Sequence, residues 1–270
     1  MHPLVEPVVQ LAQDAGKAIL PFWRQHVDVT HKADQSPVTA ADLAAHKVLV
    51  EGLVKLAPDI PVLSEEDADI AQDIRASWQR WWLVDPLDGT KEFISDSEEF
   101  TVNIALVENG EVSFGVVYIP ATGVSYFGGR EYGAFKRDNA GDTPIRVRQN
   151  PADALTVVAS RRHSSPAQEQ LLNGLGELFP ALKTANVGSS LKFCLLAEGL
   201  ADCYPRLAPT SQWDTAAAQG VVEGAGGAVL NLDGSDFTYP PRESLLNPSF
   251  ICLPDNALWR EPLLALAKTL

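Results

Sequence analysis

The feature that most constrains this chain is an apolar run that ends in two closely spaced aspartates. Residues 81–84 are all large and apolar, and Asp85, Asp88 and Thr90 follow directly. Such a run predicts a buried strand, which would bring two carboxylates and a hydroxyl together at the strand's end. Residues 85–90 also suit an ordinary surface turn, because Asp-Pro and Asp-Gly pairs are common in turns. Whether residues 85–90 form a functional site or a surface turn depends on the flanking elements and on the other acidic residues.

The first half of the chain predicts two helices followed by an antiparallel meander. Apolar residues at helical spacing predict helices over residues 4–23 and 39–56, the second with Thr39 as its N-cap. Strand-like runs follow at residues 101–108, 111–120, 123–127 and 133–136. Asn109-Gly110 between the first two runs is typical of a hairpin turn. We therefore expect an α+β half over residues 1–150.

The second half alternates strands and helices. Strands are expected at residues 155–159, just before residue 188, and at 201–205. Helices are expected at residues 166–178, 189–198, 213–223 and 257–270. This alternation is typical of an α/β arrangement, which we assign to residues 151–270.

Charge and composition exclude several functions. The 270 residues include 35 acidic and 21 basic side chains, a net charge of −14, which argues against binding a nucleic acid polymer. We identify neither an apolar stretch of membrane-spanning length nor a signal peptide, so we expect a cytoplasmic protein and leave peripheral association with the inner membrane open. The three cysteines form no CxxC motif and are expected to be buried, reduced thiols. The histidines show no zinc-binding spacing, so any metal should be a hard cation held by oxygen.

Three further acidic residues lie beside apolar elements. Glu65 follows the strand-like residues 60–63, Asp42 lies in the first turn of the helix at 39–56, and Asp214 starts a predicted helix. Each has a simple structural explanation: a solvated loop, a partner of the helix dipole, and a helix N-cap, respectively. Together with Asp85 and Asp88 they would also form one cluster able to hold two or three Mg²⁺ ions around a phosphate.

Other phosphate chemistries fit the sequence less well. It contains neither the GxxxxGK[ST] motif of a P-loop nor the GxSxG motif of a serine hydrolase. The glycine-rich residues 224–227 follow a predicted helix, so we interpret them as a helix end and turn. Phosphatases with an aspartyl nucleophile separate two aspartates by one residue, whereas two residues separate Asp85 from Asp88.

These motifs resemble the inositol monophosphatase superfamily, in residues 38–42, 82–93 and 213–218. Within it, the strings at residues 32–34, 36–42, 61–67, 188–194 and 240–248 resemble the bacterial 3'(2'),5'-bisphosphate nucleotidases of sulfate assimilation. Gly220 departs from the pattern, which usually has an apolar side chain there. The resemblance implies a layered αβαβα sandwich and a lithium-sensitive, Mg²⁺-dependent phosphatase. It also implies hydrolysis of the 3'-phosphate of adenosine 3',5'-bisphosphate to AMP and phosphate.

The resemblance also implies roles for individual residues. Metal ligands are expected at Glu65, Asp85, the Leu87 carbonyl, Asp88 and Asp214. Glu65 and Thr90 would position and help to deprotonate the attacking water, with support from Asp42. The substrate would contact Glu65, Leu87, Asp88, Gly89, Thr90, Ser189, Lys192, Arg206 and Asp214.

Two alternatives stay open at this point. The substrate could be that of an inositol monophosphatase or a related sugar phosphatase. The carboxylates could instead serve a non-catalytic cation-binding protein, although Thr90 would then have no evident purpose. His163 is a weaker candidate for contact with the base, and an exposed loop histidine explains it equally well.

Overall fold

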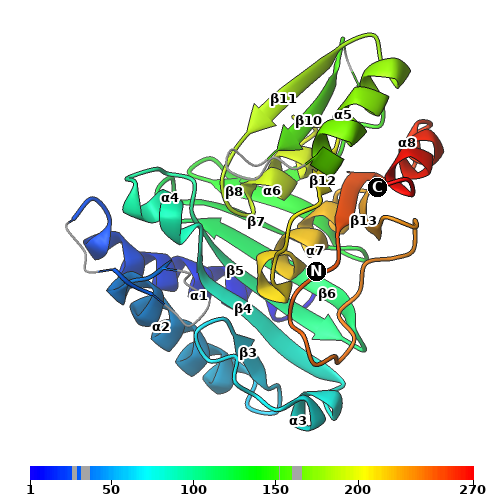
Figure 1. Ribbon diagram of the computed structural model, residues 1–270. Helices are drawn as coiled ribbons and strands as arrows, with labels where there is room; N and C mark the ends of the chain where they lie inside the picture. Colours follow the sequence, from blue (N-terminus) through cyan, green and yellow to red (C-terminus); the bar gives the residue numbers. More distant parts are fainter. Residues whose placement is uncertain (26–28, 32–36, 152, 160–165) are drawn as a thin grey trace.

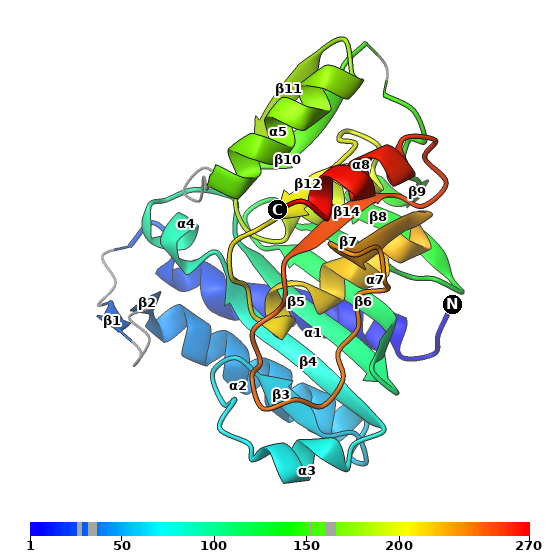
Figure 2. The same ribbon diagram turned by 45° about the vertical axis from the view of Figure 1, so that its right-hand side comes forward.

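The computed structural model describes residues 1–25, 29–31, 37–151, 153–159 and 166–270 (Figure 1). These residues form five layers in the order helix, sheet, helix, sheet, helix (Figures 1 and 2). Three clusters of buried apolar side chains fill the spaces between the layers. The expected αβαβα sandwich is therefore confirmed. The division at residue 150 stays a prediction.

The larger sheet is a meander in which strands that are neighbours in sequence are also neighbours in space. Its order is β3 (Val62–Ser64), β4 (Arg80–Asp88), β5 (Thr101–Glu108), β6 (Glu111–Ile119), β7 (Val124–Gly129), β8 (Gly133–Asp138) and β9 (Gly141–Ile145). Only the β3–β4 pair of this sheet is parallel. The hairpin at Asn109 and Gly110 is confirmed, with positive φ at both residues. Strand β9 escaped prediction because most of its residues are exposed and polar.

Two helices cover one face of this sheet. They are α1 (Val5–Ile19), continued by the 3-10 turn η1 (Leu20–Phe22), and α2 (Ala40–Leu56). Thr39 caps α2 as predicted, its side chain accepting a hydrogen bond from the backbone N–H of Ala41. Short elements complete this side of the molecule: β1 (Thr30–His31), β2 (Pro37–Val38), α3 (Gln72–Ala76) and α4 (Thr90–Ile94).

The middle layer consists of α6 (Leu191–Ala197) and α7 (Ala216–Gly224), and α7 packs directly on β6. A Cβ at Gly220 would lie 2.6 Å from the Gly115 nitrogen, and one at Gly115 would lie 1.8 Å from the Ala217 oxygen. Both positions therefore need glycine for the helix and the strand to approach this closely. The departure at Gly220 thus has a packing reason.

The second sheet has the order β12 (Tyr204–Arg206), β14 (Phe250–Pro254) and β13 (Gly227–Asn231). A separate parallel pair, β10 (Leu155–Ala159) and β11 (Leu182–Asn186), lies beside it. The outer helices α5 (Pro166–Leu178) and α8 (Arg260–Ala267) form the fifth layer. All three cysteines are free and buried, as expected.

Two predictions for the second half were imprecise, and two strands were missed. The strand expected at 201–205 is β12, which begins at Tyr204. The helix expected at 213–223 is preceded by a 3-10 turn, η2 (Gln212–Asp214), and begins only at Ala216. Strands β13 and β14 were not predicted at all, although β14 is fully buried.

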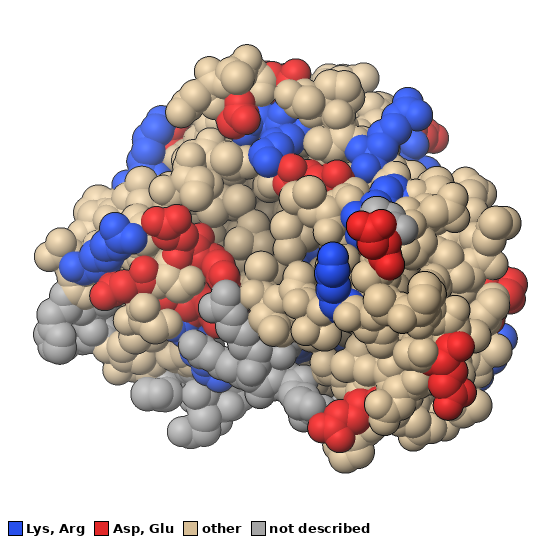
Figure 3. Space-filling view, turned by 90° about the horizontal axis from the view of Figure 1, so that it is seen from above, with Lys and Arg blue, Asp and Glu red and all other residues tan. Residues whose placement is uncertain are grey.

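No helix among the described residues combines the length and the apolar character needed to cross a membrane. On the face seen in Figure 3, the described acidic and basic side chains are interspersed, and no continuous basic stripe runs across it. Peripheral membrane association finds no support in the described residues.

Candidate active site

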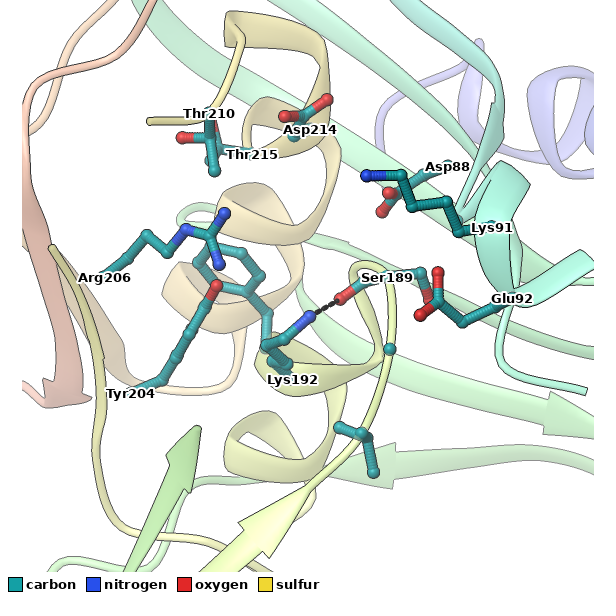
Figure 4. A pocket seen from close by; sticks show the side chains of 14 residues that line it. Asp88, Lys91, Glu92, Ser189, Lys192, Tyr204, Arg206, Thr210, Asp214 and Thr215 are labelled. Carbon is teal, nitrogen blue, oxygen red and sulfur yellow. Dashed lines mark hydrogen bonds between the residues drawn. The ribbon is translucent and has the colours of Figure 1, made fainter. Parts of the chain in front are cut away.

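A cavity of about 150 Å³ opens where the end of β4, the start of α4, the turn before α6 and η2 meet (Figure 4). Its lining comes from three separate parts of the sequence and includes Asp88, Gly89, Ser189, Lys192, Arg206 and Asp214. Aspartates lie on one side of the cavity, and Lys192 and Arg206 lie on another. Of the predicted metal ligands, Asp88 and Asp214 line this cavity together with the predicted nucleotide contacts, whereas Glu65 and Asp85 lie beside Asp214 without lining it.

The segment from Asp85 to Asp88 belongs to strand β4, which corrects the expectation of a turn directly after Val84. Asp85 pairs with Asn103 and Asp88 with Thr101, so β4 has one more residue than β5 between these pairs. Pro86 cannot donate a ladder hydrogen bond, and the Leu87 N–H donates instead to Asp85 Oδ1 at 3.0 Å. The resulting bulge redirects side chains that a regular strand would point to alternate faces.

Three carboxylates from different elements converge beside this bulge. One oxygen each from Glu65, Asp85 and Asp214 lie within 4.8 Å of one another. The Glu65 N–H donates to the Val84 carbonyl at 3.0 Å, which ties the residue after β3 to β4. The Ser211 N–H donates to Asp214 Oδ2 at 2.8 Å, which fixes the third carboxylate in the η2 turn.

Burial makes this arrangement electrostatically costly. It raises the pKa of Asp85 well above its usual range, and the nearby carboxylates of Glu65, Asp88 and Asp214 raise it further. The pKa of Asp214 is raised for the same reasons, first by burial and then by Asp88. A divalent cation would offset both effects, and a set of oxygen ligands suits a hard cation such as Mg²⁺. The donor set therefore fits a metal site.

Asp88 is oriented by two residues that sequence reasoning missed. The Ser190 hydroxyl donates to Asp88 Oδ2 at 2.9 Å and lies 3.0 Å from the Asp214 carbonyl oxygen. Asn103 Nδ2 contacts Ser190 Oγ at 2.9 Å and Asp88 Oδ2 at 3.4 Å. Asn103 is a polar residue within an otherwise apolar strand, β5, and this interruption was the available signal.

Asp42 contacts both the start of α2 and Thr90. Its Oδ2 accepts hydrogen bonds from the Thr39 N–H at 2.8 Å and the Thr39 hydroxyl at 2.6 Å, which completes the cap of α2. Its Oδ1 lies 3.3 Å from Thr90 Oγ1, and the Leu87 carbonyl oxygen lies at the same distance from that hydroxyl. The predicted contact between Asp42 and Thr90 is therefore present.

Gly89 allows Thr90 to reach this position. It precedes α4 with φ of +90°, a conformation that side chains rarely adopt. A Cβ there would also lie only 3.0 Å from the Glu99 carbonyl oxygen.

Three basic residues line the cavity: Lys91, which lies beside Asp88 (Figure 4), and Lys192 and Arg206, which are held by backbone carbonyls. Lys192 Nζ donates to the Ser189 carbonyl at 2.8 Å (Figure 4), and burial lowers its pKa. Arg206 donates to the carbonyls of Ala208 and Pro209, both at 3.1 Å. Because these acceptors are neutral, the positive charges remain available to an anion. His163 lies outside the described residues.

The sequence from end to end matches one family of proteins. Residues 1–264 match the inositol monophosphatase family. The chain belongs to this family. It is 50% identical over 249 residues to the 3'(2'),5'-bisphosphate nucleotidase CysQ of Shigella flexneri, covering 92% of this chain and 98% of that protein. The family is metal-dependent, which agrees with the acidic cluster.

Solved structures of family members agree with this assignment. CysQ from Bacteroides thetaiotaomicron superimposes with a TM-score of 0.80 at 36% identity and covers 92% of this chain and 96% of its own. An inositol monophosphatase from Zymomonas mobilis gives a TM-score of 0.76 at 27% identity, with 99% and 100% covered. The expected family and fold are thus confirmed.

Proposed function

We propose that this member of the inositol monophosphatase family is a Mg²⁺-dependent nucleotidase. It hydrolyses the 3'-phosphate of adenosine 3',5'-bisphosphate and yields AMP and phosphate. The observation that carries the proposal is that Asp214 belongs both to the carboxylate cluster around the buried Asp85 and to the lining of a cavity that contains the carbonyl-held cations Lys192 and Arg206. The similarity to proteins named 3'(2'),5'-bisphosphate nucleotidase supports it.

Two or three Mg²⁺ ions are the proposed cofactor. Glu65, Asp85 and the Leu87 carbonyl would hold one ion, and Asp85, Asp88 and Asp214 a second. When bound, the ions activate a water and neutralise charge on the leaving oxygen. The carboxylates alone would repel a phosphate, so the ions also reverse the sign of the local charge.

The residues of the chain then orient the attack. Thr90 Oγ1 can donate to Asp42 or to the Leu87 carbonyl, which leaves its lone pairs for a hydrogen from the water. Glu65 lies beside Asp85 and Asp214 and would accept the proton. A bond forms between the water oxygen and phosphorus while the bond from phosphorus to O3' breaks, without a covalent enzyme intermediate. The backbone N–H groups of Gly89 and Thr90 would hold the phosphate.

The far side of the cavity supplies substrate selectivity. The guanidinium of Arg206 can bind the 5'-phosphate through two parallel hydrogen bonds, and Lys192 adds a point charge. Ser189 lines the same part of the cavity. A sugar monophosphate would leave these cations without a partner.

The test is a comparison of substrates with purified protein and Mg²⁺. We expect kcat/KM for adenosine 3',5'-bisphosphate to exceed that for inositol 1-phosphate and fructose 1,6-bisphosphate, and Li⁺ to inhibit. Faster release of phosphate from inositol 1-phosphate would indicate an inositol monophosphatase instead. Magnesium binding without hydrolysis of any substrate would indicate a cation-binding protein.

A further inference from the structure

The connection between β13 and β14 contains a segment, residues 240–248, that we call the strap. Figure 2 shows this connection, in orange, descending from the second sheet toward β3 and α3 and then returning. The strap closely matched the nucleotidase pattern, yet none of its residues lines the cavity of the active site. Its contacts explain what it does.

One end of the strap is fixed by a buried arginine. Arg75, on α3, is only 8% exposed, and its guanidinium donates to the carbonyls of Arg242 at 3.0 Å and Glu243 at 3.1 Å. A third hydrogen bond, to the Ile70 carbonyl at 2.9 Å, fixes the arginine itself. This end is thus attached to the part of the chain that follows β3.

The other end of the strap pairs with the turn that carries Asp214. The Gln212 N–H donates to the Leu245 carbonyl at 3.0 Å, and the Asn247 N–H donates to the Thr210 carbonyl at 2.7 Å. Ser211 and Leu246 form an isolated antiparallel bridge between these two bonds. The strap therefore holds the first residue of η2 and the two residues that precede it.

The side chain of Asn247 completes this attachment. Its amide nitrogen lies 2.7 Å from the Ser211 carbonyl oxygen, 3.1 Å from Thr210 Oγ1 and 3.0 Å from Thr215 Oγ1. These three acceptors lie on both sides of Asp214 in the sequence. Asn247 itself is only 9% exposed, so water cannot easily replace its hydrogen bonds.

We propose that Asn247 is a positioning residue for the metal ligand Asp214, with Arg75 anchoring the strap that carries it. Ser211 is the link, because its carbonyl accepts from Asn247 while its N–H donates to Asp214 Oδ2. Loss of the amide would let the η2 turn move and would misplace one metal ligand. The inference rests on the proposed function only in taking Asp214 as a metal ligand.

The test measures Mg²⁺ binding to the protein directly, by calorimetry without substrate, alongside thermal unfolding. We expect Asn247→Ala to weaken Mg²⁺ binding by about tenfold or more, since losing a residue that orients a metal ligand typically costs that much. Asn247→Ser keeps one donor and should recover part of the affinity. Arg75→Lys cannot reach three carbonyls and should weaken binding by a smaller factor, about threefold.

Asn231→Ala is the matched control. Asn231 is the last residue of β13, just before the same connection, and its amide donates to Ser235 Oγ at 3.0 Å and the Asp236 carbonyl at 3.1 Å, both of which lie away from η2 in the sequence. It should leave Mg²⁺ affinity unchanged. A lower unfolding temperature for Asn247→Ala with unchanged Mg²⁺ affinity would overturn the proposal and leave a purely structural role. If Asn247→Ala does not fold, the Mg²⁺ affinities of the Asn247→Ser and Arg75→Lys variants test the proposal in the same way.

This result is separable from the proposed substrate. Failure of the wild-type protein to hydrolyse adenosine 3',5'-bisphosphate would contradict the proposed function. It would not affect the comparison of Mg²⁺ affinities, which requires no substrate.

Discussion

The two sides of the cavity solve opposite electrostatic problems. On the acidic side, Asp85 and Asp214 are buried close to other carboxylates, which raises the pKa of both. On the basic side, Lys192 and Arg206 are oriented by neutral carbonyls. The acidic side thus needs an external cation to become stable and useful, whereas the basic side is already arranged for an anion. If the proposed function holds, we therefore expect metal loading to precede productive binding of the nucleotide.

The largest effect should come from removing charge on the acidic side. Asp85→Asn should lower kcat/KM for adenosine 3',5'-bisphosphate by about a thousandfold or more, because metal ions supply several kcal/mol of transition-state stabilisation. In the presence of EDTA the same variant should unfold at a higher temperature than wild type, because a buried repulsive charge is gone. If the Asp85→Asn variant keeps its activity, Asp85 is not part of the active site.

Replacing Thr90 should affect catalysis without affecting metal binding. Thr90→Ala should lower kcat by at least about a hundredfold, because the attacking water loses a positioned partner. Mg²⁺ affinity measured by calorimetry should stay nearly unchanged, and Thr90→Ser, which keeps the hydroxyl, should retain most of the activity. Unchanged turnover in the alanine variant would contradict the proposed role.

The basic side should affect binding of the second phosphate more than catalysis. We expect Arg206→Ala to raise KM for adenosine 3',5'-bisphosphate by about tenfold, since a charged hydrogen-bonding partner is lost. Adenosine 3'-monophosphate, which lacks the 5'-phosphate, is the matched substrate and should show little change. Equal effects on both nucleotides would mean that Arg206 does not bind the 5'-phosphate.

The pH dependence of stability gives the smallest effect. The pKa values of Asp85 and Asp214 are raised in the folded state, so without metal the folded protein binds more protons than the unfolded chain above pH of about 4. The free energy of unfolding should therefore fall as pH rises through their raised pKa values.

Bound Mg²⁺ requires ionised carboxylates and should reverse this trend. At a concentration ten times its Kd, Mg²⁺ should add about 1.4 kcal/mol to the free energy of unfolding. At a fixed Mg²⁺ concentration, this stabilisation should be larger at pH 8 than at pH 5. Urea unfolding at both pH values, with and without Mg²⁺, measures the difference. A stabilisation by Mg²⁺ that is larger at pH 5 than at pH 8 would contradict the raised pKa values of Asp85 and Asp214.

The sequence predicted the order of elements well because their patterns are local. The helices over α1 and α2 and the hairpin at Asn109 follow from periodicity and turn chemistry. The bulge at Asp85 was interpreted as a turn because Pro86 and Gly89 are turn residues. The pairing with β5 that keeps this segment in the sheet depends on residues far along the chain.

The candidate site shows the same limit. Asp42, Glu65, Asp85 and Asp214 could be selected because acidic residues beside apolar elements are conspicuous. Ser190 and Asn247 could not, because neutral polar residues carry no such signal until tertiary contacts place them against the proposed ligands, and Asn103 was marked only as a polar residue among the apolar residues of β5. The proposed metal ligands could therefore be selected from the sequence, while most of the residues that contact and orient them could not.

The central claim is that the acidic side holds the metals and the basic side holds the second phosphate. The most direct measurement is a crystal structure with Mn²⁺ and a non-hydrolysable analogue of adenosine 3',5'-bisphosphate, with anomalous scattering locating the ions. We predict at least two Mn²⁺ peaks among Glu65, Asp85, Asp88 and Asp214, with the 3'-phosphate on the metals and the 5'-phosphate at Arg206. Ions bound elsewhere, or a nucleotide with its 5'-phosphate on the metals, would contradict the account.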